Sequence, residues 1–173
     1  CGIGKDDEVI TVSNTAVPTI TAIVNSGAVV KFVDINKYYL IDVDKIEQSI
    51  TKKTKAIIPV HLFGQICEMN KIMELAKKYN LKVIEDCAQA HGATYFNSKA
   101  GSIGDVGCFS FYPTKILGAY GDGGFITTNN NNLFDKMHRV RFLGIEKKKM
   151  SSSHWNGKYY AIEHGTNSRL DEV

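Results

Sequence analysis

The stretch Lys82-Val-Ile-Glu-Asp-Cys-Ala-Gln-Ala-His-Gly92 is typical of a buried strand that ends in polar side chains. Asp86 closes the apolar run, and Gln89 follows three residues later. Ligands of α/β proteins bind at the carboxyl ends of parallel strands. We therefore expect Asp86 and Gln89 to lie at a ligand-binding edge of a sheet, although an aspartate just past a strand is more commonly a helix N-cap.

Strands and helices alternate along the chain on both sides of this stretch. Strands are expected at 8–12, 29–33, 55–60, 82–86 and 124–128, and helices at 19–26, 42–50, 69–79 and 133–143. The residues 13–15 are expected to supply capping oxygens to the first helix, which Pro18 opens. This alternation predicts an α/β fold with a mainly parallel central sheet and helices on both faces.

The second informative stretch runs from Cys108 to Gly124. Phe109 and Phe111 alternate with polar residues as in a strand, and Pro113 ends the ladder. Four glycines lie in the loop that follows and directly after it: Gly118, Gly121, Gly123 and Gly124. Glycines allow the backbone to approach a ligand closely, and the loop carries one lysine, Lys115. On this stretch alone, a solvated loop lysine remains the alternative to a lysine delivered into a cleft.

A lysine and a carboxylate at two strand ends are the groups that pyridoxal 5'-phosphate requires, because the carboxylate keeps the ring nitrogen of the cofactor protonated. Two motifs then point to a family. Glu85-Asp-Cys-Ala-Gln-Ala-His-Gly-Ala93 and Phe109-Ser-Phe-Tyr-Pro-Thr-Lys115 together resemble the DegT/DnrJ/EryC1/StrS family of sugar aminotransferases. The resemblance covers essentially the whole chain.

The resemblance implies a PLP-dependent transferase of fold type I, similar to aspartate aminotransferase. Residues 1–173 would form its cofactor-binding large domain, with an N-terminal segment and a C-terminal small domain lying outside the chain. The implied reaction moves an amino group, from glutamate as donor, onto a keto group of a dTDP-, UDP- or GDP-activated deoxysugar in the biosynthesis of surface polysaccharides or glycosides.

The resemblance also implies a role for each site residue. Lys115 would bond covalently to the cofactor and act as general base. Asp86 would pair with the pyridinium nitrogen, Gln89 would lie near the phenolic oxygen, and Ser110 would bind the phosphate. Asn167 would reach the phosphate of the neighbouring subunit's cofactor, which implies a homodimer with shared active sites. The simpler alternatives are a solvent-facing serine at 110 and a turn asparagine at 167.

Some residues depart from the family's pattern or remain open. Ala16 stands where many relatives have an aromatic residue that stacks on the cofactor, and Ile116 stands where an asparagine often follows the lysine. His61 is open between a site role and a structural hydrogen bond, and His91 is expected to be a packed, hydrogen-bonded histidine.

The sequence also bears on three rival functions. A dehydratase of the same family would carry histidine in place of Lys115, so the lysine disfavours that reaction. A catalytically inactive structural or regulatory relative would keep the motifs as core. A dinucleotide-binding domain lacks support, since no G-x-G-x-x-G follows the first strand.

The composition of the chain limits the classes of partner and the compartment that we expect for the protein. A formal net charge of +3 from 21 basic and 18 acidic residues argues against nucleic-acid binding, and the one dense basic run, Lys147–Lys149, is expected to be a solvated loop. No apolar run approaches the ~20 residues of a membrane span. The four cysteines show no C-x-x-C spacing or secreted disulfide framework, which suggests a reducing cytoplasm.

Overall fold

The computed structural model describes residues 1–146 and 160–170, and it divides into two units, 1–129 and 130–173. The basic run Lys147–Lys149 lies outside the described residues. The strands are β1 (Glu8–Val12), β2 (Val29–Val33), β3 (Thr54–Ile57), β4 (Lys82–Asp86), β5 (Thr94–Tyr95), β6 (Ser98–Lys99), β7 (Val106–Ser110) and β8 (Gly124–Thr127). The helices are α1 (Val17–Asn25), α2 (Val43–Ser49), α3 (Met69–Tyr79) and α4 (Asn131–Val140), with a 3₁₀ turn, η1, at Leu62–Gly64.

The first unit is built on a six-stranded sheet with the order β2-β1-β3-β4-β7-β8. The neighbours from β2 to β7 pair in parallel, and β8 pairs with β7 in the antiparallel sense. The prediction of an α/β fold with a mainly parallel sheet is therefore confirmed. It succeeded because strands that are buried on both faces form continuous apolar runs, as in β1.

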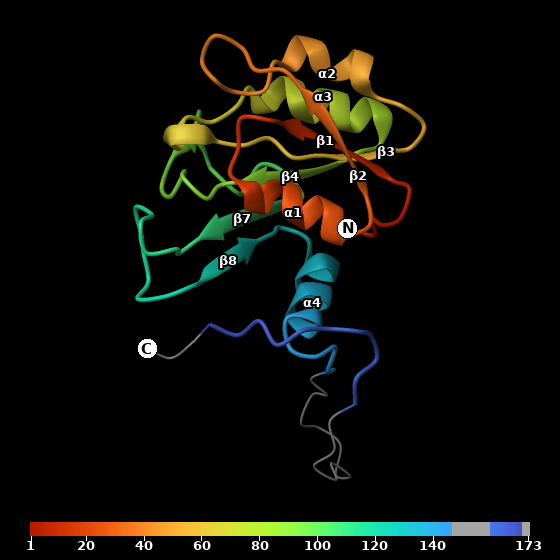
Figure 1. The fold of residues 1–173 in the computed structure, drawn as a ribbon, viewed down its shortest axis with the longest axis vertical. Coiled ribbons are helices and arrows are strands. Elements are labelled where there is room, and N and C mark those ends of the chain that lie inside the picture. The colour runs from red at the N-terminus through yellow and green to blue at the C-terminus, as the bar shows by residue number, and fades with distance from the viewer. Residues whose placement is uncertain (147–159, 171–173) are drawn as a thin grey trace. The chain divides into compact units, whose positions relative to one another are not determined.

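Helices cover both faces of this sheet, with α1 on one face and α2 and α3 on the other (Figure 1). The α1 face buries Ile23 of the helix against strand residues that include Val9 and Ala56. The opposite face buries the apolar stripes of α2 and α3, which include Ile46, Met69, Ile72 and Ala76, against Ile10, Val12, Ile57 and Val83. These two apolar layers bury both faces of the sheet, and the strand ends lie at the edge of this packed core.

The parallel strands all point their carboxyl ends to one edge of the sheet. Asp86 at the end of β4 is in register with Cys108 of β7, and Val60, beyond β3, forms a parallel bridge with Asp86. The segments that leave this edge therefore include the start of α1, the turn after His61 and the loop after Ser110.

The start of α1 differs from the expectation. Its N-cap is Ala16, and no side chain caps the first turn, so the prediction that residues 13–15 supply the cap is wrong. Asn14 instead donates its side-chain amide to the carbonyl of Tyr39, and Thr15 bonds to Thr19. The sequence also gave no indication of the two-stranded sheet β5–β6.

In the second unit, helix α4 begins after Asn130, whose side chain accepts a hydrogen bond from the Leu133 N–H. Bridges join Phe142 to Asn167 and Ile145 to Ala161, and Arg139 pairs with Glu163 at 2.8 Å. Among the described helices, none combines the length and hydropathy needed to cross a lipid bilayer.

Candidate active site

Lys115 lies in a tight turn just beyond β7. Its backbone N–H donates to the carbonyl of Tyr112 at 2.8 Å, and the Ala119 N–H donates to the carbonyl of Phe111 at 2.7 Å, so the loop folds back on its own start. Gly118 approaches closely enough that an added Cβ would lie 2.5 Å from the Pro113 carbonyl oxygen. This compact loop leaves the Lys115 side chain half-buried.

The lysine borders a pocket of about 290 Å³. The lining residues come from two sheet-edge loops and the 3₁₀ turn; they are Phe63, Gln89, Thr114, Lys115 and Ile116. The structure thus brings together Lys115 and Gln89, which are two of the predicted site residues and lie on different segments. Asp86 and Ser110 are not among the residues that line this pocket.

Gln89 is held by the backbone of Phe63. Its Oε1 accepts a hydrogen bond from the Phe63 N–H at 2.8 Å, which leaves its amide NH₂ to donate elsewhere. Phe63 has a left-handed backbone (φ 57) and a side chain that is 76% exposed. A bulky residue in this conformation is a genuine outlier, and the Gln89 bond is one contact that holds it there.

Asp86 ends β4 with both carboxylate oxygens engaged. Thr19 donates to Oδ2 at 2.7 Å, and the Ala88 N–H donates to Oδ1 at 3.1 Å. The Thr15 and Thr19 hydroxyl oxygens lie 2.8 Å apart. The sequence did not predict that either threonine takes part in contacts to Asp86; their spacing of four residues at a helix start was the available signal.

Ser110 ends β7 on the strand next to β4. Its hydroxyl oxygen accepts a hydrogen bond from the Tyr112 N–H at 3.1 Å, so its own O–H can still donate. Asn167 belongs to the second unit, where its Oδ1 accepts from Arg169 Nε at 3.2 Å. The roles of both residues toward a phosphate stay predictions.

His61 and Glu85 form a fully buried pair behind the sheet edge, with Nε2 and Oε2 3.0 Å apart. The Cys67 N–H donates to Nδ1 of His61, so Nε2 carries the proton and donates to Glu85. Burial alone would raise the pKa of Glu85, but the bond from His61 and three backbone N–H bonds outweigh it and lower the pKa below 4.5. These buried contacts favour the alternative in which His61 makes a structural hydrogen bond over a role in the site.

Cys87 lies close enough to this pair that the three side chains could surround a metal ion. However, both ring nitrogens of His61 are engaged, and the Glu85 carboxylate already accepts from His61 and from the N–H groups of Gly101, Ile103 and Gly104. Burial also raises the pKa of the Cys87 thiol, which disfavours the thiolate that a metal needs. This cluster is a packing unit.

His91 packs between Phe109 and Phe111, at ring-centroid distances of 5.5 and 6.2 Å. Its two ring nitrogens are buried and have no hydrogen-bond partner within the described ranges 1–146 and 160–170. The expectation of a packed histidine is confirmed, and the expectation of a hydrogen-bonded one is wrong. Ala16, which stands where many relatives are expected to have an aromatic residue, is exposed at the start of α1.

The structure is that of an α/β protein in which a lysine and a glutamine side chain line one pocket, beyond the carboxyl edge of a mainly parallel sheet. The model of the DegT/DnrJ/EryC1/StrS aminotransferase family matches residues 1–173. The chain therefore belongs to this family.

Two curated relatives illustrate the similarity. The dTDP-3-amino-3,6-dideoxy-alpha-D-galactopyranose transaminase of Aneurinibacillus thermoaerophilus is 53% identical over 99% of this chain and 45% of its own length. The dTDP-3-amino-3,4,6-trideoxy-alpha-D-glucose transaminase of Micromonospora megalomicea subsp. nigra is 49% identical over 99% of this chain and 44% of its own length. The chain thus spans less than half the length of these relatives.

Two solved structures have the same fold. An aminotransferase from Psychrobacter cryohalolentis superimposes with a TM-score of 0.92 at 42% identity, over 97% of this chain and 43% of that chain. The ntda protein of Bacillus subtilis, solved with bound cofactor pmp, superimposes with a TM-score of 0.85 at 37% identity, over 98% and 37% of the two chains.

Proposed function

We propose that this chain is the cofactor-binding large domain of a pyridoxal-phosphate-dependent aminotransferase that acts on a nucleotide-activated sugar. The observation that carries the proposal is the half-buried Lys115 beside Gln89 in one pocket, with the Asp86 carboxylate at the end of a neighbouring parallel strand. Membership of an aminotransferase family supports the same conclusion.

The residues present fit pyridoxal phosphate. An amine, an amide donor, a carboxylate and a hydroxyl at one sheet edge are suited to its aldehyde, phenolic oxygen, ring nitrogen and phosphate, respectively. The Lys115 amine has no ion pair or hydrogen bond in the part of the chain that the structure describes, so it is available to a ligand. When bound, this cofactor supplies an electron-withdrawing ring that eases proton removal from the substrate carbon.

The protein's own residues divide the remaining work. Lys115 holds the cofactor and, once the amino substrate has displaced it, moves a proton at Nζ during the transfer. Asp86 holds the proton on the ring nitrogen through a charge-assisted hydrogen bond. Gln89 donates its amide to the phenolic oxygen, and Ser110 donates its hydroxyl to the phosphate.

For the substrates, we propose a keto sugar linked to a nucleoside diphosphate as acceptor and glutamate as amino donor. The names of the two curated relatives, both transaminases of dTDP sugars, support the acceptor class. The family resemblance supports glutamate.

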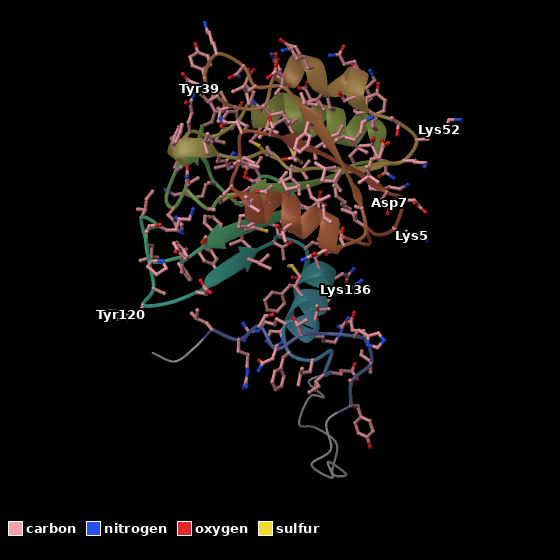
Figure 2. The ribbon with its side chains drawn as sticks, viewed as in Figure 1. Lys5, Asp7, Tyr39, Lys52, Tyr120 and Lys136 are labelled. Carbon is pink, nitrogen blue, oxygen red and sulfur yellow. The ribbon has the colours of Figure 1, made fainter. Side chains whose placement is uncertain are left out.

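We also propose a homodimer in which Asn167 completes the site of the partner. Several apolar side chains in the Lys115 loop are exposed to solvent: Ile116 is 75%, Leu117 58% and Tyr120 95% exposed. Figure 2 shows Tyr120 at the loop tip. Exposed apolar clusters of this kind mark interaction surfaces. A second copy packed here would lie next to the pocket of the first.

The cytoplasm is the proposed location. Cys67, Cys87 and Cys108 are thiols that the fold buries wholly or partly. Burial raises the pKa of Cys67 to about 12 and that of Cys108 to about 11, so these groups serve as packing residues rather than as reactive thiols. A chain without a disulfide framework is suited to a reducing compartment.

The test is a transamination assay of the full-length protein with glutamate and a panel of dTDP-, UDP- and GDP-linked keto sugars. We expect conversion of at least one keto sugar to its amino sugar, together with a visible absorption band that borohydride abolishes. A protein that binds no pyridoxal phosphate would contradict the proposal. A bound cofactor with sugar dehydration as the sole reaction would instead favour the dehydratase.

A further inference from the structure

A chain of hydroxyl groups links the start of α1 to Asp86. The hydroxyl oxygens of Thr15 and Thr19 lie 2.8 Å apart, and the Thr19 hydroxyl donates to Asp86 Oδ2 at 2.7 Å. Thr19 is 8% exposed, so water competes little for this bond. The contact joins residues that are 67 positions apart in the sequence.

The chemistry of the three groups fixes the direction of this chain. An ionised carboxylate only accepts hydrogen bonds, so the single hydroxyl proton of Thr19 must point to Asp86. The Thr19 oxygen is then an acceptor, and Thr15 must be its donor. Because the Ala88 N–H holds the other oxygen of Asp86 at 3.1 Å, both carboxylate oxygens are fixed from the protein side.

The start of α1 has no side-chain cap, because Ala16 occupies the N-cap position and Thr15 precedes it. Ser, Thr, Asp and Asn are the preferred residues at this position. The places where a strong local rule is broken are commonly functional sites.

We propose that Thr19 is a positioning residue for Asp86, with Thr15 holding Thr19 in turn. This inference rests on the proposed function, since it assumes that Asp86 meets the ring nitrogen of pyridoxal phosphate. Thr19 sets the rotation of the carboxylate about its side-chain bonds, so that a lone pair stays aimed at the ligand. It touches neither cofactor nor substrate in this role.

The experiment compares variants of the full-length protein loaded with pyridoxal phosphate. Thr19→Val removes the hydroxyl but keeps the shape, and Thr19→Ser restores the hydroxyl. Thr11→Val is the matched control: Thr11 is also a buried threonine, but its hydroxyl donates to the Ile58 carbonyl at 2.9 Å and not to Asp86. The readouts are the dissociation constant of pyridoxal phosphate and the thermal midpoint of the cofactor-free protein.

We expect Thr19→Val to raise the dissociation constant roughly ten-fold, as for one lost hydrogen bond to a charged group. Thr19→Ser should stay within about two-fold of the parent, and so should Thr11→Val, even if both valine variants lower the thermal midpoint equally. If Thr19→Val does not fold, Thr15→Val at a partly exposed position serves instead, with an expected increase of about three-fold.

A double-mutant cycle separates positioning from simple packing. In an Asp86→Asn background, adding Thr19→Val should change the dissociation constant by less than about two-fold, because the group that Thr19 positions has lost its charge. A full ten-fold effect in both backgrounds would overturn the inference, as would equal behaviour of the Thr19 and Thr11 valine variants. Those outcomes, in a parent that binds the cofactor, overturn this inference alone. A parent that binds no cofactor would instead overturn the proposed function, so the two failures are distinguishable.

Discussion

The Lys115 amino group has no carboxylate partner in residues 1–146 and 160–170, although its side chain is half-buried beside Gln89. The other half-buried lysines in the described part of the chain each pair with a carboxylate; they are Lys31, Lys45 and Lys82. A lysine that is partly buried yet unpaired is suited to a ligand rather than to the stability of the fold. At the scale of single residues, this contrast separates Lys115 from the other half-buried lysines.

Asp86→Asn tests the proposed partner of the ring nitrogen. The amide keeps the shape of the side chain but lacks the charge that would hold the ring nitrogen protonated, so turnover should fall by about 100-fold or more, while cofactor binding changes less. The measurement is turnover at saturating pyridoxal phosphate, with the dissociation constant determined separately. Turnover within a few-fold of the parent would mean that Asp86 only orients the backbone after β4.

At the scale of elements, the loop after β7 sets the position of Lys115. Gly118→Ala would place a Cβ 2.5 Å from the Pro113 carbonyl oxygen, whereas Gly121 has no neighbouring atom within 4 Å of an added Cβ. We expect Gly118→Ala to lower turnover at least ten-fold by displacing the loop, and Gly121→Ala to leave it unchanged. Steady-state kinetics of the two variants check this, and equal behaviour would refute the close packing of the loop.

The buried His61–Glu85 pair joins β4 to the turn at 101–104. Because the pKa of Glu85 is lowered by folding, its contribution to stability is present above about pH 4.5 and is lost as the pH falls through the lower folded value. Glu85→Gln should lower the free energy of unfolding by about 3 kcal/mol at pH 7 and should weaken its dependence on pH below 4.5.

Urea unfolding at pH 7 and in acid measures both effects. Glu74→Gln is the control, because Glu74 is an exposed glutamate on α3 with no hydrogen bond or ion pair in the described part of the chain. The structural assignment of the pair would be wrong if Glu85→Gln matched this control at both pH values.

The elements that were predicted well from the sequence are those in which a helical pattern of apolar residues persists over several turns, or in which apolar residues form a strand-length run. The helix at 69–79 and the strands at 8–12, 29–33 and 82–86 have the predicted bounds. The strand expected at 55–60 ends at Ile57, because the chain continues past Pro59, which lacks an N–H for a ladder. Strands β5 and β6 have two residues each, too few to carry a period.

The candidate site was predictable where chemistry lies in a local motif, and unpredictable where it depends on tertiary contacts. Lys115 and Gln89 were chosen from two motifs, and the structure brings them to one pocket. The bond from Thr19 to Asp86 spans 67 positions, and local rules instead favoured capping by the residues before the helix. Only the folded sheet edge brings these groups together.

At the scale of the whole molecule, the proposed homodimer has a specific consequence. Each site would combine Lys115 of one chain with Asn167 of the other. Asn167→Ala should weaken retention of pyridoxal phosphate by roughly 1.5 to 3 kcal/mol, the effect of one hydrogen bond to a charged group. Lys115→Ala should be inactive.

Mixing these two variants tests whether sites are shared. One site of each mixed dimer carries both defects and the other is intact, so equal mixing should restore about a quarter of parental activity at limiting cofactor. The measurement is activity after exchange of subunits, with mixed dimers verified by differently tagged chains. Absence of recovery in verified mixed dimers would mean that Asn167 contributes to the site of its own chain, or that it is only a structural residue of a turn.

The most direct test of the account is to locate the cofactor on the chain. The full-length protein is reduced with borohydride in the presence of pyridoxal phosphate, digested and analysed by peptide mass spectrometry. We predict one stoichiometric pyridoxyl modification, on Lys115, and none on the exposed Lys52, which is labelled in Figure 2. A stoichiometric modification on another lysine, or an unmodified Lys115 in protein that retains the cofactor, would contradict the account.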